Sequence, residues 1–283
     1  MRPVGDGVRD ETAAVDYGWR GILLWVQFDG SAFCGFQRQS QGLRSVGGEL
    51  ESAWFKKFAE TVVMRSSSRT DAGVHARRMP VLVRTQQTVP SRAAHLGINA
   101  FLADDLKVLA AEDLPADFDV RADATGKRYV YRLQSGPVRL PLWRRNAWHV
   151  KGKLDVAAMR AAAAVLVGSH NFAAFRSTQC TAATTLRTLH RIDIEERPDI
   201  IEITVEGNAF LHNMVRIIAG TLVGAGRLRF GPSEIATMLH QGDRAAAGQT
   251  APALGLTLDE VFYGPYGGRL GLKYKQLQMK LVD

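Results

Sequence analysis

The residues best suited to do chemistry stand side by side in the segment Arg69-Thr70-Asp71-Ala72-Gly73. A guanidinium near a carboxylate favours the ionised carboxylate, which can act as a nucleophile, a general base or an electrostatic clamp. An aspartate followed two residues later by glycine is also common in plain turns, where the carboxylate accepts backbone N–H groups. The segment by itself therefore leaves both a catalytic and a turn-capping role open for Asp71.

Two apolar runs flank this segment and predict the strands that position it. Residues 61–64 and residues 80–84 are rich in apolar and β-branched side chains, which is typical of buried strands. A connection at the end of a strand holds its side chains on a rigid base within reach of a ligand. The small residues around Asp71 allow the backbone of another molecule to come close.

Composition narrows the class of protein. The chain has 283 residues, 46% hydrophobic and 23% charged, which is ordinary for a globular protein and long enough for two lobes. The apolar runs are too short to cross a bilayer, and the charged residues between Asp6 and Glu11 argue against a signal peptide. The only cysteines, Cys34 and Cys180, form no disulfide framework and no structural zinc site. We therefore expect a cytoplasmic protein without membrane association and without a metal.

The charge points to a polyanionic partner. The formal net charge is +8, an excess that is common in nucleic-acid-binding proteins but also arises from composition alone. Arginines and lysines alternate with aromatic residues, a mixture that suits RNA with unpaired nucleotides because cations pair with phosphates and rings stack on bases. The basic residues concerned are Arg77, Arg78, Lys127, Arg128, Arg139, Arg144 and Arg145, and the aromatic ones are Tyr129, Tyr131, Trp143 and Trp148.

Hydrophobic periodicity predicts an α+β fold. Strands and helices mix in each half without the regular alternation of a Rossmann fold, so we expect two lobes, each a mainly antiparallel sheet with helices packed on one face and a catalytic cleft between them. The expected strands lie near 20–29, 61–64, 80–84, 106–109, 127–134, 189–195 and 200–205, and the expected helices near 46–58, 91–102, 155–167, 207–224 and from 232. Ser91 is the expected N-cap of the second helix.

The same pattern predicts where the lobes divide. Residues 1–18 lack apolar periodicity and are expected to form a disordered leader, while 266–283 form a C-terminal tail. An N-terminal lobe with the catalytic loop is expected over 19–135, and a C-terminal lobe over 136–265.

With its motifs in this order, the chain resembles the tRNA pseudouridine synthase A (TruA-like) family over roughly residues 20–263. The segment 69–76, Arg-Thr-Asp-Ala-Gly-Val-His-Ala, matches the catalytic motif of that family and is a specific signal. Four further segments match in the same order: 28–31 with 35–37, 127–131, 207–211 with 214–216, and 251–253 with 255–256.

The resemblance implies an enzyme that isomerises uridine to pseudouridine in the anticodon stem-loop of tRNA, at positions 38–40. It also implies a homodimer that needs no cofactor or metal. By the same resemblance Asp71 is the nucleophile, Tyr129 stacks on the uracil, Arg216 pairs with the catalytic carboxylate and Arg69 helps to extrude the base. Attack of the carboxylate at C6 of the base and attack at C1′ of the ribose both stay open. We expect further substrate contacts from Arg77, Arg78, Lys127 and Arg128.

Three positions depart from the family pattern. Ser68 stands where glycine is usual, Phe36 where tryptophan is usual, and Gly47 where glutamine is common. None of these changes removes a catalytic group. Three histidines, which are His75, His170 and His212, are expected to be structural, since histidine readily bonds to backbone groups.

Two other functions are compatible with parts of the sequence. The Asp71-Ala72-Gly73 triplet is similar to the loop of aspartic hydrolases, but that chemistry needs two carboxylates that share a proton, and no second such motif lies between apolar strands. A non-catalytic RNA-binding module would keep the basic residues without using Asp71. Replacement of Asp71 by asparagine distinguishes the module from the enzyme.

Overall fold

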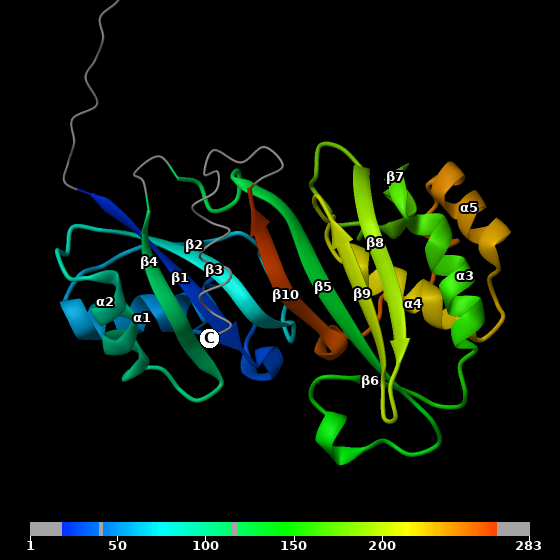
Figure 1. The fold of residues 1–283 in the computed structure, drawn as a ribbon, viewed down its shortest axis with the longest axis horizontal. Helices are drawn as coiled ribbons and strands as arrows, with labels where there is room; N and C mark the ends of the chain where they lie inside the picture. The colour runs from blue at the N-terminus through cyan, green and yellow to red at the C-terminus, as the bar shows by residue number, and fades with distance from the viewer. Residues whose placement is uncertain (1–18, 40–41, 115–117, 265–283) are drawn as a thin grey trace, which may run out of the picture.

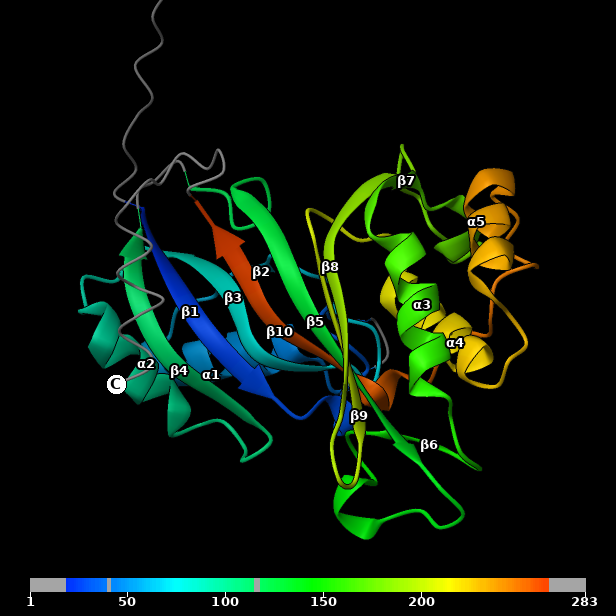
Figure 2. The same ribbon diagram turned by 45° about the vertical axis from the view of Figure 1, so that its right-hand side comes forward.

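One continuous sheet organises the molecule. The computed structural model describes residues 19–39, 42–114 and 118–264, so the expected leader and tail lie outside the described residues. In that part of the chain, ten strands form a sheet in the order β4-β1-β3-β10-β5-β9-β8-β7, with β2 paired to β3 and β6 paired to β5. Figures 1 and 2 show α1 and α2 beside one half of this sheet and α3, α4 and α5 beside the other.

The bounds of most elements follow the hydrophobic pattern. In the N-terminal half these are β1 (Arg20–Phe28), α1 (Val46–Phe58), β2 (Met64–Ser66), β3 (His75–Thr85), α2 (Ser91–Asn99) and β4 (Leu106–Leu114). In the C-terminal half they are β5 (Ala124–Ser135), β6 (Trp148–Val150), α3 (Val156–Leu166), β7 (Gly168–Asn171), β8 (Leu186–Glu196), β9 (Ile201–Gly207), α4 (Met214–Gly226), α5 (Pro232–Gln241) and β10 (Leu256–Tyr263). The α+β class and the mostly antiparallel pairing expected from the sequence are confirmed.

Strand β10 joins the two halves. It runs parallel to β3, with Thr257 opposite His75, and antiparallel to β5, with Leu258 opposite Tyr129. The two sheets expected from the sequence are therefore the two halves of one sheet. The loop between β2 and β3, which the sequence predicts to be catalytic and which we call the catalytic loop, lies close to β10 in the middle of this sheet. No strand was expected at this position, because a register shift between Leu258 and Glu260 interrupts the alternation of side chains.

Two helices begin with a side-chain cap, and the one cap that the sequence predicts differs from the structure. The Ser45 and Asp155 side chains accept the backbone N–H groups of Gly48 and Ala158 at the starts of α1 and α3. The expectation for Ser91 is wrong: it is the first residue of α2, and Pro90 occupies the N-cap position without a side-chain bond. The reason is that the Pro90 carbonyl already accepts the first helical N–H, from Ala94, at 3.0 Å.

Two groups of buried side chains stabilise the sheet, one under each half. The second half's core includes Val74, which comes from the catalytic loop of the first half. The first half's core includes Leu258 and Val261 from β10, near the C-terminal end of the described chain. Each half thus anchors a segment of the other, which fixes the catalytic loop relative to the C-terminal half. Within the described residues, no helix has the length and apolar character needed to span a membrane.

Candidate active site

The catalytic loop runs from β2 to β3 and is held by its backbone. The Asp71 carbonyl accepts the N–H of Val74 at 3.2 Å, and this turn places Gly73 at φ 80°, a conformation that favours glycine. The loop contacts residues 33–36, because the Phe36 N–H donates to the Thr70 carbonyl at 3.2 Å. Gly35 makes this approach possible, since a Cβ there would lie 2.6 Å from the Thr70 oxygen.

His75 stabilises the end of the loop where β3 begins. Its Nδ1 accepts the Gly30 N–H at 3.0 Å, so Nε2 carries the proton that is donated to the Leu254 carbonyl, also at 3.0 Å. The imidazole thereby connects the end of β1, the start of β3 and the segment before β10, and its Nδ1 also lies 3.2 Å from Asp29 Oδ1. The expectation that His75 is structural is confirmed.

Asp71 lies between two basic side chains from the C-terminal half. One carboxylate oxygen, Oδ2, is 3.3 Å from Arg216 Nη1, and the other, Oδ1, is 3.3 Å from His212 Nε2. Arg216 is itself oriented, because its Nε donates to the Ala251 carbonyl and its Nη1 donates to Asn213, both at 2.8 Å. The pairing of Arg216 with Asp71 expected from the resemblance is present in the structure. The Asp71 side chain is 30% exposed and so accessible to a ligand.

His212 is the functional candidate that the sequence analysis missed. It was expected to be structural, yet no backbone bond of its ring is seen in the described residues, and its Nε2 faces Asp71. Helical spacing could not indicate this role, because His212 precedes the N-cap Asn213 and lies outside the helix that carries Arg216.

Tyr129 occupies the wall of the cleft next to the loop. Its hydroxyl lies 3.4 Å from the Ser68 hydroxyl, and its ring packs edge-on against Phe210 with 5.0 Å between ring centres. Burial raises the pKa of Tyr129 above its ordinary value, and the negative charge of Asp71 acts in the same direction, while the Ser68 bond opposes them. The phenol therefore stays protonated at neutral pH and can donate a hydrogen bond.

Lys127 lies two residues earlier on the same face of β5. Its Nζ donates to the Ser67 carbonyl at 2.7 Å. Burial lowers the pKa of Lys127 from 10.5 to about 8, and the positive charge of Arg121 contributes. A buried lysine whose pKa is lowered to about 8 is typical of a functional cleft.

These residues line one cleft between the halves, with a volume of about 650 Å³. It brings together five of the residues expected at the site: Arg69, Asp71, Lys127, Tyr129 and Arg216. The other wall comes from residues 179–182 and 208–213. Among the described residues, no group of three or more histidine, cysteine, aspartate or glutamate side chains is arranged to hold a metal ion.

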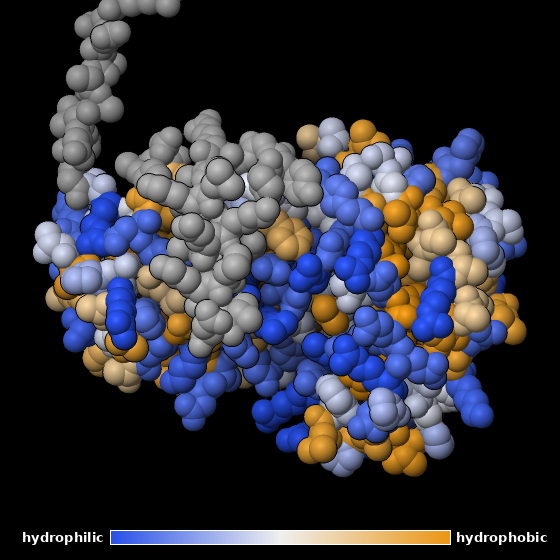
Figure 3. Space-filling view, in the orientation of Figure 1, coloured by the Kyte–Doolittle hydropathy of each residue, from blue (hydrophilic) through white to orange (hydrophobic). Residues whose placement is uncertain are grey.

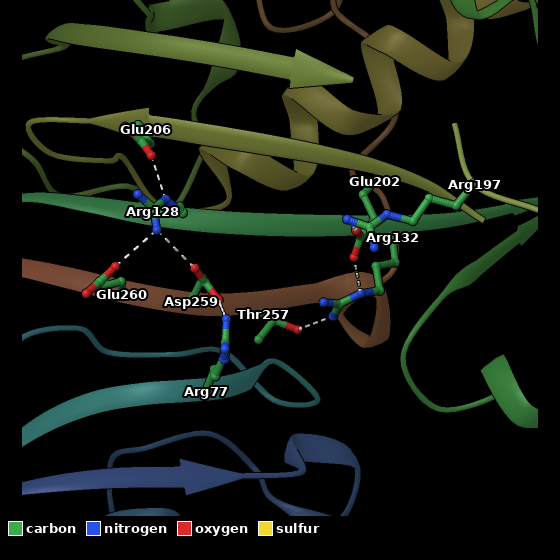
Figure 4. A network of polar contacts seen from close by, with 9 residues as sticks. All are labelled: Arg77, Arg128, Arg132, Arg197, Glu202, Glu206, Thr257, Asp259 and Glu260. Carbon is green, nitrogen blue, oxygen red and sulfur yellow. Dashed lines mark hydrogen bonds and ion pairs between the residues drawn. The ribbon is translucent and has the colours of Figure 1, made fainter. Parts of the chain in front are cut away.

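Arg77, Arg78 and Arg128 are not part of this cleft. Side chains alternate along β5, so Arg128 points to the face opposite Tyr129. There its guanidinium pairs with Glu206 at 2.5 Å and Glu260 at 3.0 Å (Figure 4), while Arg77 pairs with Asp259 at 3.2 Å. Arg77 and Arg128, which the sequence predicts as substrate contacts, thus lie outside the cleft lining and are paired with carboxylates. Arg78 follows Arg77 on β3 and does not line the cleft.

The face opposite the cleft is polar in its middle (Figure 3). Besides the Arg128 contacts, Arg132 donates to Glu202 at 2.8 Å, and Glu202 also pairs with Arg197 at 2.8 Å. The arginines drawn on this face are thus paired with carboxylates.

Comparison with known proteins assigns the class. A family model described as tRNA pseudouridine synthase matches residues 162–264, which include His212 and Arg216. The archaeal box H/ACA sRNP Nop10–Cbf5 complex aligns with 13% identity and a TM-score of 0.33 over 80% of this chain and 59% of that chain, which is too distant to support an argument. Over residues 162–264, less than half of its length, the chain is therefore similar to the pseudouridine synthases.

The particular family follows from relatives that span the chain. A tRNA pseudouridine synthase A from Geotalea daltonii is 43% identical over 244 residues, which cover 86% of this chain and 100% of the relative. Another, from Pelobacter propionicus, is 45% identical over the same shares of both chains. The chain belongs to the tRNA pseudouridine synthase A family and is an enzyme of the isomerase class.

Proposed function

We propose that this enzyme isomerises uridine to pseudouridine in the anticodon stem-loop of tRNA, with Asp71 as the nucleophile acting on a base turned out of its stack. The observation that carries the proposal is the carboxylate of Asp71, held at 3.3 Å by both Arg216 and His212 in a cleft that also contains Tyr129. This site is built from both halves of the chain, and its size suits a nucleotide.

The reaction needs no external reactant. The N1–C1′ bond of uridine breaks, the uracil turns, a C5–C1′ bond forms, and the proton that leaves C5 is balanced by one gained at N1. A carboxylate can attack C6 of the base or C1′ of the ribose. Either route requires the ionised form of Asp71, which the neighbouring Arg216 stabilises.

Turning the base out of its stack costs a few kcal/mol, least where the nucleotide is already in a loop. Arg69 is exposed at the rim of the cleft and can hold the displaced strand through its phosphates. Tyr129 offers its ring as a platform for the uracil. The resemblance to the family further supports a homodimer that works in the cytoplasm.

The hydrolase alternative fits the site poorly. Its mechanism needs a second carboxylate that shares a proton with the first. The partners seen within 4 Å of the Asp71 carboxylate in the described residues are instead the guanidinium of Arg216 and the ring nitrogen of His212. Both favour a single ionised carboxylate.

The proposal is tested by incubating the purified protein with unmodified tRNA transcripts and mapping pseudouridine by position. We expect product confined to the anticodon stem-loop. Absence of product from every transcript would contradict the proposed reaction, and product confined to another arm would contradict the proposed position.

Ser68 is expected to act through Tyr129. Because the two hydroxyls lie 3.4 Å apart, replacement of Ser68 by alanine frees the phenol and lowers kcat by about threefold to tenfold, the range of one neutral hydrogen bond. The Ser68→Ala change has no further effect in a Tyr129→Phe background, as single-turnover rates of the four proteins will show. Equal losses in both backgrounds would mean that Ser68 supports the turn instead.

Lys127 makes stability depend on pH. Its pKa is 10.5 in an unfolded chain and about 8 in the folded protein, so the unfolded chain binds more protons between these values. The free energy of unfolding therefore rises by about 2 kcal/mol between pH 7.5 and 9.5 relative to a Lys127→Met variant. Urea unfolding of both proteins across this range measures the difference, and parallel curves would contradict the lowered pKa.

A further inference from the structure

A second hollow lies beside the catalytic cleft. Its volume is about 470 Å³, and it lies between residues 36–38, the start of α1, β2 and residues 119–121. Gln37, Arg69 and Arg121 line both the hollow and the cleft, so the two spaces adjoin. An RNA strand that enters the cleft can continue into this hollow, which we call the side groove.

The arginines of the side groove have no carboxylate partner at ion-pair distance in the described part of the chain. Four exposed arginines line the groove: Arg38, Arg65, Arg69 and Arg121. The arginines on the opposite face of the sheet, by contrast, are paired with glutamate and aspartate. Unpaired guanidinium groups that converge on one groove attract a polyanion and bind its phosphates.

The two acidic side chains of the side groove already accept hydrogen bonds from backbone N–H groups. Asp119 accepts the backbone N–H groups of Ala122 and Arg121, both at 2.8 Å, and these bonds hold the pKa of Asp119 below its ordinary value, with the positive charges of Arg65 and Arg121 acting in the same direction. Glu51 accepts the backbone N–H of Met64 at 3.0 Å. Neither carboxylate forms an ion pair with the arginines, so the groove keeps an excess of positive charge.

The floor of the side groove is apolar. Phe36 and Met64 are buried there, and Val63 exposes 72% of its surface. Gly47 lets the start of α1 pack closely on Phe36, since a Cβ at this position would lie 2.9 Å from the Phe36 carbonyl oxygen and 3.5 Å from its ring. An apolar floor within a ring of guanidinium groups matches the chemistry of a nucleotide, which has a flat base and a charged phosphate.

We infer that the side groove binds a nucleotide that flanks the target uridine in the same RNA strand. Its phosphates lie against Arg65 and Arg121, and its base lies over Val63 and Met64. The inference rests on the proposed function for the identity of the RNA, but it assigns a separate binding site next to the catalytic one.

A matched pair of double variants tests the charge. Arg65→Gln with Arg121→Gln removes two phosphate contacts, so the slope of log affinity for tRNA against log salt becomes less steep by about 1.4, and affinity falls at least about tenfold in low salt. Arg77→Gln with Arg197→Gln removes equal charge from the opposite face, at positions 64% and 55% exposed, and leaves the slope unchanged. Equal slopes for both double variants, or a change in both, would overturn the inference.

A photocrosslinking amino acid at position 63 tests the occupant. With the same tRNA, we expect crosslinks to nucleotides within a few positions of the target uridine. Crosslinks confined to distant arms, or none, would contradict a flanking nucleotide in the groove. Pseudouridine is mapped in parallel: product without the expected crosslinks rejects the side groove alone, whereas crosslinked tRNA without product rejects the proposed reaction alone.

Discussion

Replacement of Asp71 by asparagine is expected to abolish pseudouridine formation while tRNA binding is retained. Asparagine keeps the size of the side chain but removes the charge and the nucleophilic oxygen. Loss of a nucleophile typically lowers kcat by about 10⁴-fold or more. The groups that hold RNA, such as Arg69, belong to other residues, so the tRNA dissociation constant should change by less than about threefold.

The measurement is a single-turnover assay of pseudouridine formation together with a direct binding titration. Asp104→Asn is the matched control, because this carboxylate is fully exposed and distant from the cleft lining. The control should react at the wild-type rate. A functional Asp71→Asn protein would favour the non-catalytic RNA-binding module, since such a module does not use the carboxylate.

Replacement of Arg216 by lysine is expected to lower kcat by about 10²-fold with little change in KM. Arg216 uses separate nitrogens to reach the Ala251 carbonyl and the Asp71 carboxylate, at 2.8 and 3.3 Å. The single ammonium of lysine cannot reproduce this fork, so the carboxylate loses its fixed orientation. Since binding of tRNA depends on other side chains, the loss should fall on kcat.

The Arg216→Lys protein is compared with Arg132→Lys, which alters an ion pair with Glu202 on the opposite face of the sheet. Steady-state kinetics and thermal unfolding of both variants separate catalysis from stability. A wild-type kcat for Arg216→Lys would show that a positive charge alone, without the hydrogen bond to the Ala251 carbonyl, suffices to position Asp71. A purely structural role predicts instead that the two variants lose stability without a selective fall in kcat.

Much of the fold could be predicted because its pattern is local. Strand β1 and helix α1 follow directly from alternation and from a four-residue spacing of apolar side chains. Strand β10 could not be predicted, because a register shift interrupts the alternation of its side chains and because its partners β3 and β5 lie more than a hundred residues earlier in the chain. The joining of the two halves into one sheet depends on this strand alone in the described topology.

The sequence predicted the pairing at the centre of the site better than it predicted which basic residues line the cleft. Asp71 and Arg216 are 145 residues apart, and only the order of motifs related them. Arg128, which the sequence predicts as a substrate contact, does not line the cleft, because alternation on β5 separates it from Tyr129. Clustering of charge along the sequence does not indicate a shared face, whereas the ion pairs of the folded chain do.

The central claim is that the cleft around Asp71 carries out the isomerisation, and release of the C5 proton reports on it directly. In a transcript with tritium at C5 of the uridines in the anticodon stem-loop, the proposed reaction replaces the C5–H bond by a C5–C1′ bond. We expect the wild-type enzyme to release tritium in step with pseudouridine formation, and the Asp71→Asn protein to release none while it binds the same tRNA. Release by the variant at the wild-type rate would contradict the account.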